Sequence, residues 1–250
     1  MRINRALAKA GCGSRRAVEE LVRAGKVRVN GVVVTELSAQ VDPEKDRLVV
    51  SGKKLRSTTS CKFIAFYKPR GVLSTWKDER DRKCLADYFP ARGSGRVFAV
   101  GRLDRDSEGL LLITNDGNLA HSLTHPSAQV PRIYEVVVSP PPQPSSVESL
   151  AGITELEDGP VQPAGVRLCR PRAKLGVLEI TVKEGRNRLV RRLLAAQGFV
   201  VRRLTRRQFG GVKLDKLRPG TKRELSAREL ALLRELAAVN QLKPTSGAML

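Results

Sequence analysis

Long apolar runs are missing from this 250-residue sequence. A helix that crosses a bilayer needs about 20 consecutive apolar residues, and no stretch approaches that length. Hydrophobic residues nevertheless make up 41% of the chain, which is enough for a sizeable core and argues against wholesale disorder. We therefore expect a cytoplasmic globular protein with no membrane contact, long enough for a small domain followed by a larger one.

Cysteine and histidine are also scarce. The four cysteines are Cys12, Cys61, Cys84 and Cys169. They form no CxxC pair, so a zinc site or a disulfide framework has little support and reduced cytosolic thiols are the simpler interpretation. The two histidines, His121 and His125, are four residues apart and could share a helix face. A metal site needs further ligands, so we expect a structural role and no metal.

Acidic residues are few in comparison with basic ones. Lys and Arg total 46 against 25 Asp and Glu, a formal net charge of +21. Residues 1–56 hold 13 basic and 6 acidic side chains, and residues 183–223 hold 14 basic and 2 acidic ones. Two separate basic surfaces indicate two places that bind a polyanion, most plausibly nucleic acid. General solubility or an acidic membrane surface are the alternatives, but no aromatic-rich amphipathic helix accompanies the basic clusters.

The first 56 residues are predicted to form a small αβ module. Their basic, acid-poor start could be a transit peptide, but helical spacing and turn signals run straight through it. Ile3, Leu7 and Ala10 recur at helical spacing, and Ser14 is a suitable N-cap for a second helix. Asn30-Gly31 between valine-rich runs predicts a hairpin.

The rest of the chain is predicted to be a larger α+β domain over residues 62–238, with a mixed, mainly antiparallel sheet flanked by helices. A polar linker at 57–61 precedes it, and a flexible tail at 239–250 follows it. Strands are expected near 62–67, 96–100, 110–114, 133–138, 166–169 and 177–182, and helices near 84–89, 117–124, 145–151, 186–197 and 226–238. The proline-rich run at 139–146 is expected to be a rigid surface loop.

The N-terminal segment SRRAVEELVRAGKVRVNG resembles the RNA-binding domain first described in ribosomal protein S-four, over residues 2 to about 54. Arginines in the first turn of its second helix lie where a helix N-terminus already favours phosphate. The resemblance implies binding to structured RNA; the alternative is a basic, solvated helix. The RNA-binding candidates in this segment are Arg2, Arg5, Arg15, Arg16, Arg23, Lys26 and Arg28.

A second motif, FAVGRLDRDSEGLLLITNDG, spans residues 98–117. Asp104 lies between Arg102 and Arg105, so arginine could keep its carboxylate ionised and oriented. Such a carboxylate suits nucleophilic attack or proton transfer. From composition alone, a structural salt bridge at a strand end is the favoured interpretation.

The same motif resembles the active-site signature of the pseudouridine synthases, in the Rsu/Rlu group that modifies ribosomal RNA. Ser107 replaces the usual threonine and keeps the hydroxyl. The resemblance implies that Asp104 is the catalytic residue, as nucleophile or base, and that Arg102 helps to hold the RNA helix open while the uridine is flipped out. Flipping is required because the reacting atoms cannot be reached inside a stacked helix.

A third motif, RIYEVVV at 132–138, contains Tyr134. A tyrosine on an apolar strand is usually a core residue. The family resemblance implies instead that Tyr134 stacks on the target base, an interaction worth about 1–3 kcal/mol, and is a candidate for proton removal.

The fourth motif covers residues 178–214, where Gly185 breaks a strand and a helix is expected from Arg186. Its resemblance to the family implies an ion pair between Arg191 and Asp104. Leu189 stands where family members generally have glutamine, so one polar contact is in doubt. Leu178 and Ile180 would form an apolar wall of the uracil pocket, and Arg188 and Arg192 would contact substrate. Arg186, Arg202, Arg203, Arg206 and Arg207 are expected to bind phosphates or, alternatively, to form a solvated edge.

Together these motifs predict an enzyme that isomerises a uridine in ribosomal RNA without cofactor or metal. A monomer is the simplest expectation. A non-catalytic ribosome-assembly factor is one alternative, but it would predict loss of Asp104, Tyr134 or Arg191. A DNA-binding protein is another, but no helix-turn-helix signature accompanies the charge. The sequence specifies neither the uridine nor the ribosomal subunit.

Overall fold

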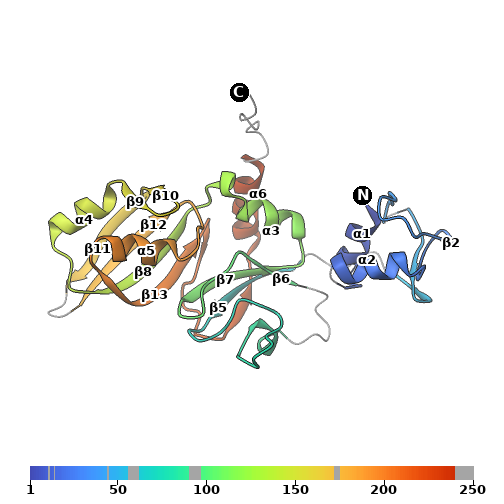
Figure 1. Ribbon diagram of the computed structural model, residues 1–250, viewed down its shortest axis with the longest axis horizontal. Coiled ribbons are helices and arrows are strands. Elements are labelled where there is room, and N and C mark those ends of the chain that lie inside the picture. Colours follow the sequence, from blue (N-terminus) through green and yellow to red (C-terminus); the bar gives the residue numbers. More distant parts are fainter. Residues whose placement is uncertain are drawn as a thin grey trace. The chain divides into compact units, whose positions relative to one another are not determined.

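The computed structural model describes residues 1–10, 12–13, 15–43, 45–55, 62–89, 97–171 and 175–239 (Figure 1). The proposed N-cap Ser14, the linker 57–61 and tail residues 240–250 lie outside these residues, as does the side chain of Arg15. The chain divides into two compact units, one containing residues 1–55 and the other most of residues 63–239. The domain boundaries expected from the sequence stay a prediction.

The N-terminal unit packs two short helices on a small antiparallel sheet. Its elements are α1 (Ile3–Lys9), α2 (Arg15–Arg23), β1 (Val27–Val29), β2 (Val32–Val33), β3 (Leu48–Val50) and β4 (Lys53–Lys54). The strands are ordered β2-β1-β3-β4. Asn30 and Gly31 have φ angles of 53° and 91°, the left-handed pair that a tight two-residue hairpin requires, so the predicted turn is confirmed.

The core of this unit is aliphatic. Its buried residues are Ile3, Ala6, Leu7, Val18, Val22, Val27, Val41, Leu48 and Val50. They come from one face of each helix and one face of the sheet, as the helical and strand periodicities predict. Arg16 and Arg23 are consequently left on the outer face of α2.

The second unit is built on a nine-stranded sheet. Its main strands are β5 (Phe63–Lys68), β7 (Glu108–Thr114), β8 (Arg132–Ser139), β11 (Gly165–Pro171), β12 (Gly176–Val182), β13 (Val200–Phe209) and β15 (Lys222–Glu224), with β6 (Phe98–Val100) and β14 (Val212–Lys213) beside β7 and β13. Their order is β11-β12-β8-β13-β7-β5-β15, and β9 (Thr154–Leu156) pairs separately with β10 (Gly159–Val161). The β13–β7 pair is parallel and its neighbours along the sheet are antiparallel, so the predicted mixed α+β class is confirmed.

β13 was not predicted. Its sequence, VVRRLTRRQF, is too rich in arginine to suggest a strand with a partner on each side. The structure nevertheless places it between β8 and β7, near the middle of the sheet. Its arginines are accommodated there by Glu108 and by a backbone carbonyl group of β7.

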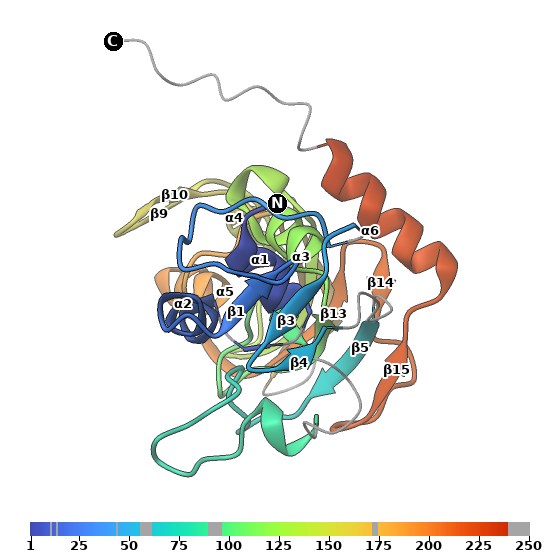
Figure 2. The same cartoon turned by 90° about the vertical axis from the view of Figure 1, so that its right-hand side faces the viewer.

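The helices are α3 (Gly117–Thr124), α4 (Pro144–Ala151), α5 (Leu189–Ala196) and α6 (Ala227–Val239). α4 packs against β11 and α5 against β13, while α6 lies near residues 126–128 (Figures 1 and 2). The helix expected from Arg186 begins at Leu189, because its N-cap Arg188 has a left-handed φ of 49°. The helix expected at 84–89 is a single 3₁₀ turn, Leu85–Asp87. Among the helices described, none has the length and apolarity needed to span a bilayer.

Candidate active site

The motif that contains Asp104 leads directly into β7, a strand whose seven residues are all buried. Gly109 of β7 pairs with Arg206 of β13 and has a φ of +105°. A Cβ atom added at Gly109 would lie 2.7 Å from the Arg206 backbone nitrogen and still closer to its carbonyl oxygen. A glycine is therefore needed here for the two strands to approach, and their approach fixes Arg206 beside the motif.

The backbone on both sides of Asp104 is held by the segment that follows β5. Ser74 Oγ donates a hydrogen bond to the Leu103 carbonyl oxygen at 2.7 Å and accepts one from the Leu103 N–H at 3.1 Å. Gly71 N–H donates to the Arg105 carbonyl oxygen at 2.6 Å. These contacts position the Asp104 side chain, which is 33% exposed. No local pattern in the sequence indicates that Ser74 or Gly71 reaches this loop.

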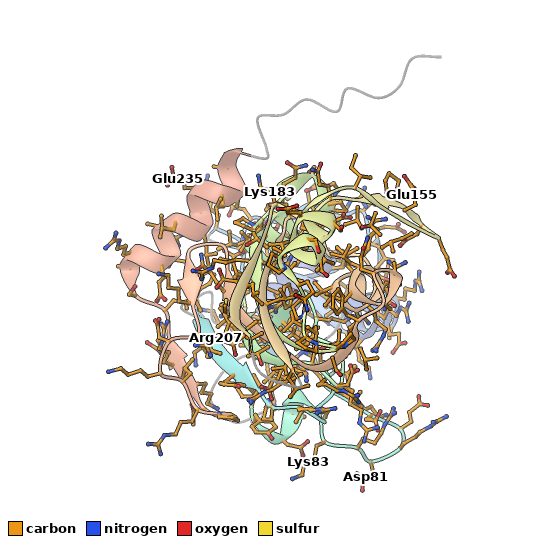
Figure 3. All side chains as sticks on the ribbon, turned by 90° about the vertical axis from the view of Figure 1, so that its left-hand side faces the viewer. Asp81, Lys83, Glu155, Lys183, Arg207 and Glu235 are labelled. Atoms are coloured by element: carbon orange, nitrogen blue, oxygen red, sulfur yellow. The ribbon has the colours of Figure 1, made fainter. Side chains whose placement is uncertain are left out.

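The segment from Gly71 to Phe89 is itself cross-braced. Arg82 donates to both carboxylate oxygens of Asp78, at 2.7 and 3.0 Å, and this hydrogen bonding lowers the pKa of Asp78. Trp76 packs edge-on against Phe89, with ring centroids 5.7 Å apart. Asp81 and Lys83 lie at the edge of the molecule in the view of Figure 3. These contacts hold together the segment whose Gly71 and Ser74 bind the backbone beside Asp104.

Arginines from the start of α5 reach the motif, but not in the predicted pairing. Arg191 Nη2 lies 3.2 Å from Asp106 Oδ2 and donates to the Asp106 carbonyl oxygen at 3.0 Å. Arg188 binds both carboxylate oxygens of Asp106, at 3.1 and 3.2 Å, and its Nη1 lies 3.7 Å from Asp104 Oδ2. The expected Arg191–Asp104 ion pair is therefore wrong for this structure, because Asp106 occupies Arg191 and Arg188 is the cation beside Asp104.

The charge of Asp106 is stabilised by this arrangement. Burial alone would raise the pKa of Asp106, but hydrogen bonds from Arg188 and the charge of Arg191 outweigh it and lower the pKa. Asp106 is thus an ionised anchor for both arginines.

A cavity of about 270 Å³ opens beside Asp104. Tyr134, which is 9% exposed, lines it from β8, and Val182, Leu204 and Phe209 give it apolar walls. Other lining residues include Arg102, Ser107, Arg132, Glu184, Arg188, Leu189 and Arg206. The predicted wall residues Leu178 and Ile180 are fully buried and do not line the cavity. Both lie on β12 before Val182, the residue of that strand that reaches it.

Two arginines are buried in the wall of this cavity. Arg206 is 2% exposed and Arg132 is 7% exposed. The guanidinium carbons of both lie 5.3 Å from the centre of the Phe209 ring. Arg206 is enclosed by the sheet and reaches the cavity instead of the outer surface, and phosphate binding by this residue stays a prediction. Arg132 was not singled out from the sequence.

Lys68, at the end of β5, is another buried cation that sequence analysis missed. Its Nζ donates to the carbonyl oxygens of Ser107 and Pro69, at 2.8 and 3.0 Å. Burial lowers the pKa of Lys68 to about 8, while the negative charges of Asp104 and Asp106 act in the opposite direction. Lys68 therefore connects β5 to Ser107, at the end of the loop that contains Asp104.

Three further arginines predicted to contact RNA already have protein partners. Arg186 binds Glu184, at 2.7 and 2.9 Å, and the 158–160 turn. Arg192 binds both carboxylate oxygens of Asp158, at 2.7 and 2.8 Å, and does not line the cavity. Arg203 is bound by Glu108. These three arginines are thus bound to protein carboxylates in this structure, and their contact with RNA stays a prediction.

Other predicted cations are exposed. Arg102 lies at the cavity, and Arg202 and Arg207 lie on β13. In the N-terminal unit the exposed set is Arg2, Arg5, Arg16, Arg23, Lys26 and Arg28. The buried Val18 and Val22 define the opposite face of α2, so Arg16 and Arg23 face solvent.

His121 and His125 lie with ring centroids 5.7 Å apart. His125 Nδ1 is within 2.7 Å of Ser127 Oγ and caps the short 126–128 turn. Across the part of the chain that the structure describes, no group of three or more His, Cys, Asp or Glu side chains is placed to hold a metal ion. The histidine pair therefore has a local structural contact.

Comparison with protein families gives two matches. A family model described as RNA pseudouridylate synthase matches residues 62–196. An S4 domain model matches residues 1–48.

Individual relatives extend these matches over nearly the whole chain. An uncharacterised RNA pseudouridine synthase of Mycobacterium tuberculosis is 42% identical over 235 residues, covering 93% of this chain and 92% of that protein. The ribosomal large subunit pseudouridine synthase B of Bacillus subtilis is 39% identical over 238 residues, covering 94% and 96%. A crystal structure of a pseudouridylate synthase is 28% identical, with a TM-score of 0.66, and covers 93% of this chain and 99% of that one.

Proposed function

Because the chain belongs to the RNA pseudouridylate synthase family, we propose that it isomerises a uridine of large-subunit ribosomal RNA and that Asp104 is its catalytic carboxylate. The chain is an RNA pseudouridine synthase, an isomerase. In this reaction the bond from N1 of uracil to C1′ of ribose breaks, the base turns, and C5 bonds to C1′ instead.

Asp104 is assigned as the catalytic residue because the carboxylates that line the cavity differ in how they are bound by arginine. Two carboxylates line the cavity, Asp104 and Glu184. Glu184 is bound through both oxygens by Arg186. Asp104 has a 3.7 Å contact with Arg188 and one third of its side chain exposed. Asp104 is therefore the carboxylate in the cavity that is able to approach a substrate.

The cavity suits a base that has left the RNA helix. Its apolar walls and the ring of Tyr134 offer surfaces for the uracil, and stacking on an aromatic ring contributes about 1–3 kcal/mol per base. Arg102 would contact the RNA that the uridine leaves behind, and its exposure at the cavity supports this role. Flipping gives Asp104 access to the ribose and the base.

The N-terminal unit would hold the surrounding RNA. Its exposed arginines and Lys26 present positive charge to solvent, which suits binding to phosphates. RNA from the large ribosomal subunit is the proposed substrate because the relative in Bacillus subtilis, among others, carries that name.

The test is to map pseudouridine in ribosomal RNA by chemical labelling and sequencing. Cells with the intact gene would be compared with a deletion strain and with strains carrying Asp104→Asn or Asp81→Asn. Asp81 is exposed and has a φ of 54°, which asparagine tolerates, so it is the matched control.

We expect one large-subunit uridine to lose its mark in the deletion and Asp104→Asn strains and to keep it with Asp81→Asn. Loss in the deletion alone would reject Asp104 as the catalytic residue. An unchanged map in the deletion strain would reject ribosomal RNA as the substrate.

A further inference from the structure

Four side chains on one face of the sheet form a cluster in the cavity wall. Arg132 and Tyr134 lie two residues apart on β8, so both point to the same face. Across the strand pair, Tyr134 is opposite Arg206 and Arg132 is opposite Phe209. All four line the cavity beside Asp104.

A bulge in β13 makes this cluster possible. In a regular strand, residues three apart such as Arg206 and Phe209 point to opposite faces. The pairing of β13 with β8 shifts by one residue between Arg206 and Gln208. This bulge brings Arg206 and Phe209 to the same face, where both arginines flank the Phe209 ring.

The two arginines are buried without the partners that a buried cation normally has. Neither forms an ion pair with any carboxylate of the described chain. Arg206 donates through Nε to the Leu110 carbonyl oxygen at 2.7 Å, but its Nη2 is buried without a hydrogen bond. Nη1 of Arg132 is likewise buried and unpaired. Unpaired buried N–H groups cost stability, so their retention beside Asp104 points to a partner that arrives with the substrate.

Resting on the proposed function, we propose that Arg132 and Arg206 are catalytic residues that stabilise the negative charge of the uracil when its bond to ribose breaks. Cleavage of the N1–C1′ bond leaves the electron pair on the base, where N1, O2 and O4 share the charge. C5 then bonds to C1′, the C5 proton leaves to a base, and N1 takes up a proton. The arginines exchange no proton and donate hydrogen bonds to the base oxygens throughout.

Arg132 and Arg206 are more deeply buried than the arginines that would bind phosphates. Arg102 and Arg188 are exposed at the cavity, where the RNA backbone has access. Arg132 and Arg206 lie in the wall, 7% and 2% exposed, next to the predicted stacking partner Tyr134. The part of a flipped nucleotide that enters deepest is the base, so the base is the group that meets them.

The test compares single-turnover rates and RNA affinities of Arg132→Gln and Arg206→Gln on two large-subunit ribosomal RNA transcripts, one with uridine and one with 5-fluorouridine. Fluorine withdraws electrons and stabilises the anionic base without help from the protein. Consumption of the nitrogen-linked nucleoside is followed on both transcripts by chromatography and mass spectrometry after digestion. Uridine and its carbon-linked isomer have equal mass and are separated by retention time. On the fluorinated transcript C5 carries fluorine, so no C5 proton leaves and the readout is loss of the N1–C1′ bond. Arg167→Gln, which removes an exposed cation from β11, is the control expected to leave activity unchanged.

On uridine RNA we expect each variant to lose about 100-fold in single-turnover rate, with a Kd within threefold of the original protein. On 5-fluorouridine RNA the loss should shrink by about tenfold or more. An equal loss on both transcripts would overturn the proposal. A raised Kd with an unchanged rate would also overturn it and assign the pair to phosphate binding.

Two further measurements keep the result interpretable. Circular dichroism and thermal unfolding identify a variant that does not fold. Arg132→Lys, which keeps the charge, is measured in every case and should lose less than the about 100-fold expected for Arg132→Gln. If the original protein modifies neither transcript, the proposed substrate has failed, whereas activity of the original protein with unaltered variants counts against the arginine pair alone.

Discussion

At the scale of single residues, the site is built from charges whose environments differ sharply. Asp106 and Glu184 are each bound by arginine, Glu108 is enclosed by hydrogen-bond donors, and Asp104 keeps access to the cavity. In the sequence all four are alike in being carboxylates within three residues of an arginine. Only the contacts distinguish the anchors from the candidate catalyst.

Lys68 gives a pH prediction at this scale. Its pKa is lowered to about 8 in the folded protein, from about 10.4 in an unfolded chain. Between these values the unfolded state binds more protons than the folded state, so the contribution of Lys68 to stability rises with pH. Below about pH 8 both states are protonated and the cost of burying the charge is fully present.

We therefore expect the unfolding free energy of the original protein minus that of Lys68→Met to increase from pH 8 to pH 10. Denaturant unfolding at a series of pH values measures it, and comparison with the variant cancels the titration of other groups. The buried position of Lys68 would be contradicted if the unfolding free energy of the original protein minus that of Lys68→Met stayed constant or decreased over this range.

At the scale of elements, the close approach of the parallel strands β7 and β13 determines which residues meet at the site. It joins the motif loop to the strand that carries Arg206, and it depends on the missing side chain of Gly109. The loop from Gly71 to Phe89 supports the other side of the same motif.

Gly109→Ala should destabilise the protein by about 3 kcal/mol or more, because the new methyl group would meet the Arg206 backbone and the φ is unfavourable for alanine. Gly198→Ala is the matched control: its φ is +78°, but no atom lies within 4 Å of the added Cβ. It should cost only about 1 kcal/mol. Urea unfolding of both variants tests this; equal losses would mean that the strands separate easily and that the approach is not tight.

The secondary structure was predictable where local patterns dominate. The apolar run of β7, the Asn30-Gly31 hairpin and the apolar face of α2 all follow from spacing and turn chemistry. β13 was not, because its arginines are balanced by Glu108 and a backbone carbonyl group of the neighbouring strand β7. Such compensation is invisible to a local pattern.

At the scale of the whole molecule, some basic side chains stabilise the fold and others are exposed and available to bind RNA. The arginines of residues 183–223 are largely paired or buried, whereas the set in the N-terminal unit is exposed. The basic excess of residues 183–223 therefore overstates the number of unpaired cations there, because several of these arginines are paired with carboxylates from other segments.

RNA binding should respond accordingly. The triple substitution Arg16→Gln, Arg23→Gln and Arg28→Gln should weaken RNA binding and reduce the slope of log K against log salt by about 1 for each phosphate that is no longer bound. The single-turnover rate at saturating RNA should be unchanged. Kd values measured across a salt series test this, with Arg167→Gln as control. An unaltered slope would show that the N-terminal unit does not contact phosphates.

The sequence by itself determined the two-part organisation, the α+β class and, through the GRLD motif, the family and the candidate Asp104. These depend on local spacing and on short motifs, which can be recognised without knowing the tertiary contacts. The tertiary structure decided which arginine lies beside Asp104, that Val182 and not Leu178 or Ile180 reaches the cavity, and that Arg132 and Arg206 are buried in its wall. Those outcomes depend on strand order, on the β13 bulge and on the backbone approach at Gly109, which join residues that are far apart in the sequence.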